Sequence, residues 1–186
     1  GGAVRWARDT FFSDGGYDVM NQIAGTVPVG SEGLTFLPYL SGERTPHNDP
    51  LARGAFAGAT LGHGGAHFAR AVFEGVCYGL LDGMNCLSSL GADAQELRVT
   101  GGGAKSQLWL QMLADVFGRP CVSLETDEGP AYGSAILAGV GIGLWPDVRT
   151  ACAQTIRQKG RVAPSGRDYS AGYSQYRALY QALKNW

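Results

Sequence analysis

A strand, a run of three glycines and a helix follow one another directly in residues 97–118, LRVTGGGAKSQLWLQMLADVFG, and this order constrains the fold most. Apolar residues predict a strand over 97–100, and their spacing after Ser106 predicts a helix that Gly118 ends. Such a glycine turn brings bare backbone to a helix N-terminus, where free N–H groups and the positive end of the dipole favour a nucleotide. Ser106 is expected to cap the helix or to hydrogen-bond that ligand.

The two best-known nucleotide loops fit this turn poorly. The pattern G-x-x-x-x-G-K-[ST] fails, because the glycines that should precede Lys105 and Ser106 do not stand at the required positions. The pattern G-x-G-x-x-G is nearly matched by Gly101, Gly103 and Ser106, with Glu125 about 20 residues further on. A dinucleotide fold would place this strand near a domain start and not after a long helix, so a dinucleotide-dependent enzyme stands only as an alternative.

The rest of the chain alternates predicted helices and strands, as in an α/β fold. Helices are predicted over residues 1–12, 18–24, 67–90, 106–117, 130–139, 147–158 and 168–183, and strands over 34–40, 55–60, 97–100 and 121–124. Glycine makes up 29 of the 186 residues without a collagen period, so turns, helix ends and close backbone contacts are expected to use it. Tyr169, Tyr173, Tyr176 and Tyr180 recur at helical spacing and predict a half-buried packing face.

Charge and hydropathy argue against two classes of partner. The chain has 15 Lys+Arg and 16 Asp+Glu with no run of one sign, so neither a nucleic-acid surface nor an anionic membrane patch is expected. The longest apolar stretch, 131–145, is interrupted by glycines and is too short to span a membrane. Four scattered cysteines and three histidines without metal-ligand spacing predict reduced thiols, a cytoplasmic location and no protein-held metal.

A second candidate feature is the loop SGERTPHNDPLARG, residues 41–54. Its charged residues Glu43, Arg44, Asp49 and Arg53 predict a strongly specified loop that is either tied by an internal ion pair or forms one wall of a cleft. It carries no nucleophile beside a base, and the strained elbow that a hydrolase needs is absent.

An acidic stretch, Glu125, Asp127 and Glu128, precedes the predicted helix that begins at Pro130. Carboxylates at a helix N-terminus stabilise the helix dipole, which is a sufficient explanation for them. A magnesium site at this position is the alternative.

Four segments carry a resemblance to a known family. Residues 54–74, GAFAGATLGHGGAHFARAVFE, are similar to the second signature of the FGGY carbohydrate kinases, departing from it at Ala59. The preceding loop, FLPYLSGERTPHNDPLARG (36–54), resembles the form found in the xylulokinase branch of that family. The glycine turn and EGPAYGSAILAG (128–139) resemble its nucleotide lobe. The likeness runs from Gly1 to about Gly143 and more loosely through the tyrosine-rich tail, residues 164–186.

The resemblance implies that residues 1–186 form one unit, the C-terminal, nucleotide-binding lobe of a two-lobed sugar kinase. Its fold would be an α/β lobe of the actin-like ATPase or ribonuclease-H-like kind, incomplete at its N-terminal side because the family's first strands are missing. The catalytic base would then belong to the N-terminal lobe. No catalytic residue is therefore expected in this chain, and residues 1–186 alone are expected to be inactive.

The resemblance also implies where ligands bind. Gly101, Gly102 and Gly103 would hold the adenosine of ATP, with Gly102 and Ser106 in contact positions. Gly1 and Arg5 match positions that touch the nucleotide in related kinases, and Glu43 and Arg44 would line the cleft. Mg²⁺ would be bound mainly through the phosphates of ATP.

The activity implied for the whole protein is transfer of the ATP γ-phosphoryl group to a ketopentose, and D-xylulose is the first candidate for that substrate. Its partners would be ATP, a small sugar and its own N-terminal lobe, with neither nucleic acid nor membrane. The oligomeric state stays open, with a homodimer as one alternative because related kinases are often dimers. Two alternatives remain open: a family member acting on gluconate, ribulose or a polyol, and a non-catalytic ATP-binding module of the actin or Hsp70 kind.

Overall fold

A computed structural model describes residues 1–125 and 129–185 of the chain. Helices and strands alternate through it, as the sequence predicts for an α/β fold. In chain order the elements are α1 (Gly2–Phe11), α2 (Gly16–Ala24), η1 (Ser31–Gly33), β1 (Thr35–Leu37), β2 (Ala55–Ala57), α3 (Gly65–Ser89), β3 (Leu97–Val99), η2 (Gly102–Lys105), α4 (Gln107–Phe117), β4 (Cys121–Leu124), α5 (Gly129–Gly141), α6 (Val148–Thr155), β5 (Gln158–Val162) and α7 (Ser170–Leu183).

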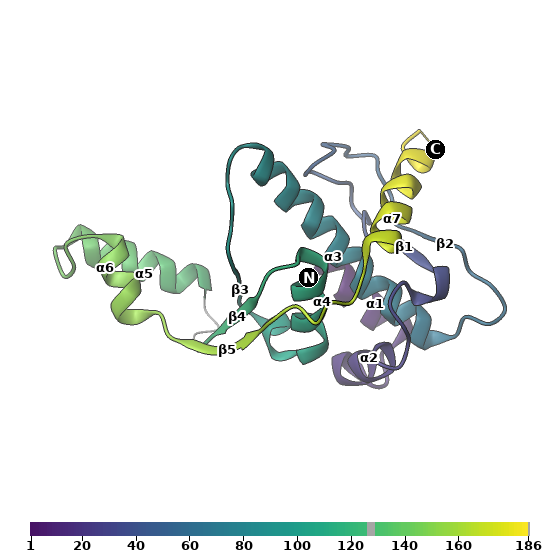
Figure 1. Ribbon diagram of the computed structural model, residues 1–186, viewed down its shortest axis with the longest axis horizontal. Helices are drawn as coiled ribbons and strands as arrows, with labels where there is room; N and C mark the ends of the chain where they lie inside the picture. The colour runs from purple at the N-terminus through teal and green to yellow at the C-terminus, as the bar shows by residue number, and fades with distance from the viewer. Residues whose placement is uncertain (126–128, 186) are drawn as a thin grey trace.

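The long helix α3 forms the centre of the main body, and α1, α2, α4 and β1 all pack against it (Figure 1). Its side chains from Ala69 to Tyr78 are mostly buried, which the apolar spacing of residues 67–90 predicts. At Gly75 the helix meets the backbone of β1, because a Cβ there would overlap the carbonyl oxygen of Phe36. A glycine in the middle of a helix is thus explained by close backbone packing.

Two small sheets complete the main framework. β1 and β2 pair antiparallel, and β3, β4 and β5 form a second sheet with β4 in the middle. β3 runs parallel to β4, while β5 runs antiparallel to it. Beyond the end of this sheet, α5 and α6 pack against each other and extend away from the other helices (Figure 1).

The strand β5 corrects the sequence prediction of one helix over residues 147–158. The helix α6 begins after Asp147, whose carboxylate caps it by accepting from Thr150 N–H, but it ends at Thr155. Gln158 instead begins β5, which lies on the surface and shows no apolar alternation. Its ladder with β4 specifies the strand, and that contact has no signature within the segment itself.

The last helix, α7, lies beside β1 and α3 (Figure 1) and contributes a cluster of tyrosines. The hydroxyls of Tyr39 and Tyr176 lie 2.6 Å apart, and Tyr173 donates to Asp82. Tyr169, Tyr176 and Tyr180 are buried, so this packing face lies deeper than the half-buried face that the sequence predicts.

A tight turn before β1 places four consecutive residues at positive φ: Gly30 at 83°, Ser31 at 47°, Glu32 at 53° and Gly33 at 94°. Non-glycine residues avoid this region, so the turn needs external support. The N–H of Gly30 donates to Glu74 Oε1 at 3.0 Å, and the Ser31 hydroxyl donates to the carbonyl of His67 at 2.7 Å. Helix α3 therefore holds the turn in place.

Two further findings concern membranes and thiols. Among the helices that the structure describes, none is long and apolar enough to cross a membrane. All four cysteines are free thiols; Cys77 and Cys121 are buried, and the other two are partly exposed.

Candidate functional site

The glycine turn connects β3 to α4 by a short helical segment, η2. Gly101 has φ 76° and ψ −167°, a conformation that glycine alone adopts without strain. Ser106 is the N-cap of α4, because its hydroxyl accepts a hydrogen bond from Trp109 N–H at 3.1 Å. The capping role expected for Ser106 is confirmed, and the turn sits directly at the helix N-terminus.

The three glycines of the turn differ in what the chain itself requires of them. Gly101 needs its positive φ, and a Cβ on Gly103 would lie 3.2 Å from the indole Nε1 of Trp109. At Gly102 neither constraint applies: a Cβ would meet no atom within 4 Å, and φ is not positive. A bare backbone at Gly102 therefore has no explanation within the described chain, but it would suit a ligand that lies flat against it.

Ser106 has a second partner that the sequence offers no means of finding. Its hydroxyl donates to Oδ1 of Asn21 at 2.5 Å, across a sequence separation of 85 residues. Asn21 belongs to α2, which packs against α3. The turn is thus tied both to the helix that follows it and to a helix near the start of the chain.

Gly1 and Arg5 lie at the beginning of α1. The N–H of Arg5 donates to the carbonyl of Gly1 at 3.1 Å, so the two residues share the first turn of this helix. Both are exposed, and a Cβ on Gly1 would meet nothing within 4 Å. α1 packs on α2 and α3, and these two helices also support the glycine turn, through Asn21 of α2 and through the packing of α3 on α4.

Glu43 and Arg44 lie elsewhere, in the loop between β1 and β2. The backbones of Glu43 and Asp49 exchange hydrogen bonds of 2.8 and 2.7 Å, and Glu43 Oε1 also accepts from Thr45 N–H at 2.7 Å. The Asp49 carboxylate accepts from Leu51 and Ala52 N–H and from the Tyr180 hydroxyl. Arg44 is exposed.

These contacts contradict one of the two alternatives for this loop, that an internal ion pair ties it. Among the described residues the loop contains no ion pair; carboxylates that accept backbone N–H groups hold it instead, and His47 stacks on Tyr180 with ring centroids 3.7 Å apart. The physical reason is geometric, because Arg53 turns its guanidinium onto the carbonyls of Pro50 and Ala52.

An open apolar groove of about 720 Å³ runs along α3, β3 and α4. Thr45 of the charged loop and Thr100 beside the glycine turn both line it. The remaining lining residues are Leu80, Gly83, Met84, Cys86, Leu87, Leu90, Leu97, Arg98, Val99, Trp109, Leu113 and Phe117. The groove connects the neighbourhoods of the two candidate features, although neither Glu43 nor Arg44 lines it.

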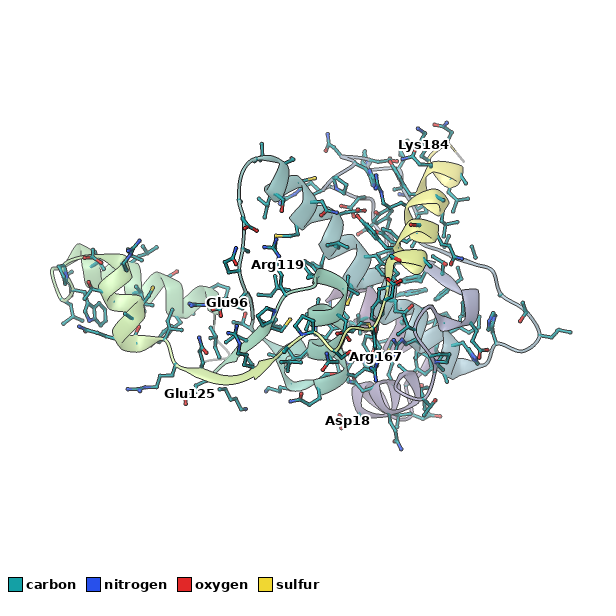
Figure 2. All side chains as sticks on the ribbon, viewed as in Figure 1. Asp18, Glu96, Arg119, Glu125, Arg167 and Lys184 are labelled. Carbon is teal, nitrogen blue, oxygen red and sulfur yellow. The ribbon has the colours of Figure 1, made fainter. Side chains whose placement is uncertain are left out.

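The acidic stretch is only partly described. Glu125 lies at the end of β4, where its N–H donates to the carbonyl of Arg157 at 3.1 Å, and Figure 2 shows its side chain at the outer edge of the sheet. Asp127 and Glu128 lie outside the described residues. Within residues 1–125 and 129–185, no three His, Cys, Asp or Glu side chains come together in a way that could hold a metal ion.

Two ion pairs act on Glu96, the residue before β3. Arg161 and Arg98 donate to it at 2.8 and 3.2 Å, and these hydrogen bonds lower the pKa of Glu96. In the interior, burial raises the pKa of Glu74 despite its bond to Arg70. Neither group lies in the glycine turn or lines the groove, so what the described part of this site offers a ligand is open backbone and the positive end of the α4 dipole.

Comparison with known proteins gives consistent matches over the chain. The family described as the FGGY family of carbohydrate kinases, C-terminal domain, matches residues 1–142. A xylulose kinase of Staphylococcus epidermidis is 37% identical over 183 residues, covering 98% of this chain and 37% of that protein. The chain thus spans little more than a third of the length of the curated relatives it matches.

Solved structures agree in fold. A ligand-bound xylulose kinase from Lactobacillus acidophilus matches 97% of the chain with a TM-score of 0.89 and 32% identity, over 37% of its own length. A gluconate kinase from the same organism matches 98% of the chain with the same TM-score and identity, over 38% of its own length. The expected lobe, of the actin-like ATPase or ribonuclease-H-like kind, is confirmed as the fold.

Proposed function

The chain belongs to the FGGY family of carbohydrate kinases, and from this membership we propose that residues 1–186 form the C-terminal, nucleotide-binding lobe of a sugar kinase. The whole protein transfers the γ-phosphoryl group of ATP to a hydroxyl of a small sugar. Phosphoryl transfer of this kind depends mainly on positioning and on stabilisation of charge, with a carboxylate to accept the hydroxyl proton. The N-terminal lobe supplies that carboxylate.

The observation that carries the nucleotide site is the open backbone at Gly102. It stands beside the capped N-terminus of α4, and nothing in the described chain requires a glycine there. The adenosine of ATP lies against Gly101, Gly102 and Gly103, with Ser106 in contact. Gly1 and Arg5, exposed at the start of α1, reach the same nucleotide from a second side.

The substrate is D-xylulose. Support comes from the xylulose kinases of Staphylococcus epidermidis and Lactobacillus acidophilus, which match nearly the whole chain. The gluconate kinase that matches equally well in structure makes gluconate the second candidate. Glu43 and Arg44 form part of the wall of the cleft between the two lobes, beside the sugar.

Magnesium accompanies ATP and is held by its phosphates. This placement agrees with the usual behaviour of Mg²⁺, which keeps several waters and is bound largely through substrate phosphates. The free thiols of all four cysteines support a reducing compartment, the cytoplasm, and we expect a homodimer that light scattering of the whole protein can test.

The test is ATP turnover by the whole protein with a panel of D-xylulose, D-ribulose, gluconate and glycerol, with and without a magnesium chelator. We expect phosphorylation of D-xylulose with the highest kcat/KM, and no turnover without magnesium. A higher kcat/KM for gluconate would show that the substrate is gluconate and not D-xylulose, while the proposal of a sugar kinase would stand. ATP binding without sugar-dependent turnover would favour the actin or Hsp70 kind of module, and protection by NADH alone in a thermal shift would favour a dinucleotide enzyme.

A further inference from the structure

Asn21 lies at a point where α2 meets the glycine turn, and both ends of its side chain are engaged. Its amide Nδ2 donates to the carbonyl of Tyr17, one turn earlier in the same helix, at 2.7 Å. Its Oδ1 accepts from the hydroxyl of Ser106 at 2.5 Å. A reversed amide would place two acceptors opposite each other at Tyr17, so this orientation is required by the donor and acceptor inventory.

The helix that carries Asn21 gives it a fixed position. Met20 immediately precedes Asn21, Ala24 lies three residues after it, and both are fully buried. α2 also packs along α3. The bond from Nδ2 to Tyr17 removes the remaining freedom of the amide. Oδ1 is therefore a stationary acceptor that faces the turn from outside the strand and helix that form it.

The hydroxyl of Ser106 has one proton and two lone pairs. Asn21 takes the proton, and the N–H of Trp109 occupies one lone pair. One lone pair remains, so Ser106 can accept one more hydrogen bond but cannot donate one. A group that meets this lone pair must be a donor, such as a hydroxyl or an amino group, and cannot be a bare phosphate oxygen.

We propose that Asn21 is a positioning residue for the nucleotide: by taking the proton of Ser106, it turns the serine hydroxyl into an oriented acceptor for a donor group of the adenosine. This inference rests on the proposed function, since it assumes that ATP binds at the glycine turn. Asn21 acts through Ser106 and touches no reacting atom. Its loss therefore weakens nucleotide binding and leaves sugar binding unchanged.

The experiment is a double-mutant cycle in the whole protein, with Asn21→Ala, Ser106→Ala and the double variant. Each is assayed for its Kd for ATP by calorimetry and for its KM for sugar. A hydrogen bond of ordinary net strength corresponds to about a three- to tenfold change in Kd. We expect each single variant to weaken ATP binding by about that factor. The double variant should bind ATP no more weakly than Ser106→Ala alone, because the proposal has Asn21 act through Ser106.

Gln22→Ala is the matched control. Figure 2 shows Asp18 at the outer surface of α2, and Gln22 lies four residues further along, on the same exposed face of the helix. This variant should leave the Kd for ATP within about twofold of the starting protein. Thermal unfolding of every variant is measured alongside, so that a change in Kd can be told from a loss of folding.

The outcomes separate the two proposals. If Ser106→Ala weakens ATP binding and Asn21→Ala does not, or if their effects simply add, the role of Asn21 is refuted while the proposed function stands. If Asn21→Ala raises the KM for sugar as much as the Kd for ATP, its effect is general and the positioning role is again refuted. If the unmodified protein binds no ATP, both proposals fail together.

Discussion

Arg70 and Glu74 form an ion pair in the interior of the protein, one turn apart on α3, with Nε and Oε1 separated by 2.6 Å and side chains only 3% and 4% exposed. Each partner also reaches another element. The Arg70 guanidinium donates to the hydroxyl of Tyr169 at 2.8 Å, and Glu74 accepts from the N–H of Gly30. The pair therefore connects the central helix to the positive-φ turn before β1 and to the segment that leads into α7.

Removing one member of this pair should destabilise the protein strongly. Arg70→Met leaves a buried carboxylate without its cation, and the free energy of unfolding should fall by about 3–5 kcal/mol. Urea unfolding of the whole protein measures the loss. The variant Arg70→Met/Glu74→Gln should recover part of it, because no unpaired charge remains and the introduced amide oxygen can still accept from Gly30. A double variant less stable than the single one would contradict this account.

The Arg70→Met variant also has a predictable pH dependence. Burial already raises the pKa of Glu74, and removal of Arg70 raises it further. A carboxyl whose pKa is higher in the folded state favours folding below its ordinary pKa and loses that contribution as the pH rises through the folded value. The deficit of Arg70→Met should therefore be smaller at about pH 4 than at about pH 7.

Two glycines on α3 should respond in opposite directions to the same substitution. Gly75→Ala places a Cβ on the carbonyl of Phe36 and should cost more than about 2 kcal/mol, because helix and strand must separate. Gly83→Ala meets no atom within 4 Å and should stabilise α3 by about 0.5–1 kcal/mol through helix propensity. Thermal unfolding measures both, and equal shifts would show that backbone contact at Gly75 is unimportant.

Two substitutions in the glycine turn should separate the effect of backbone strain on stability from the effect of ligand contact on ATP binding. Gly101→Ala forces an L-residue into a region that glycine alone tolerates, so it should destabilise the protein by about 1–3 kcal/mol. Gly102→Ala should leave the unfolding midpoint unchanged and raise the KM for ATP about tenfold or more, because its Cβ points into space that only a ligand would fill. Unchanged ATP kinetics in Gly102→Ala would remove the main support for the nucleotide site.

Alkaline pH should weaken the contact between α3 and the start of α7. Burial raises the pKa of Tyr169 to about 12, above its ordinary value of about 10. Its stabilising contribution is complete below the ordinary pKa and is lost as the pH rises through the folded value, so stability should fall between about pH 10 and pH 12. Tyr169→Phe should flatten that part of the profile, and tyrosinate absorbance should show the delayed ionisation.

Most elements follow from local patterns, and the misses have a common cause. Apolar spacing and a terminal glycine are enough to predict α3 and α4 to within two residues, because a helix makes its hydrogen bonds within itself. The strand β5 carries no such pattern, since its ladder partner lies in β4. The loop that holds Glu43 is likewise predictable as an ordered segment, but its hydrogen bonds cannot be read from its charges.

The candidate site divides in the same way. The glycines and the capping role of Ser106 can be recognised from residues 97–118, since a capped helix after a glycine turn is a local arrangement. The family is recognised chiefly from the resemblance carried by residues 36–74. The role of Asn21 cannot be recognised in this way, because no feature of the sequence indicates that residues 21 and 106 lie in contact.

The amino-acid order by itself determined most of the helices and the glycine turn, which depend on short-range spacing, and its motifs carried the resemblance to the kinase family. Only the tertiary structure decided that Gly102 alone among the three glycines is unconstrained, that Arg70 and Glu74 brace two distant segments, and that Asn21 holds the proton of Ser106. These are contacts between surfaces that meet only when the chain is packed around α3, and a residue's partners across such a surface are set by the packing and not by its neighbours in sequence.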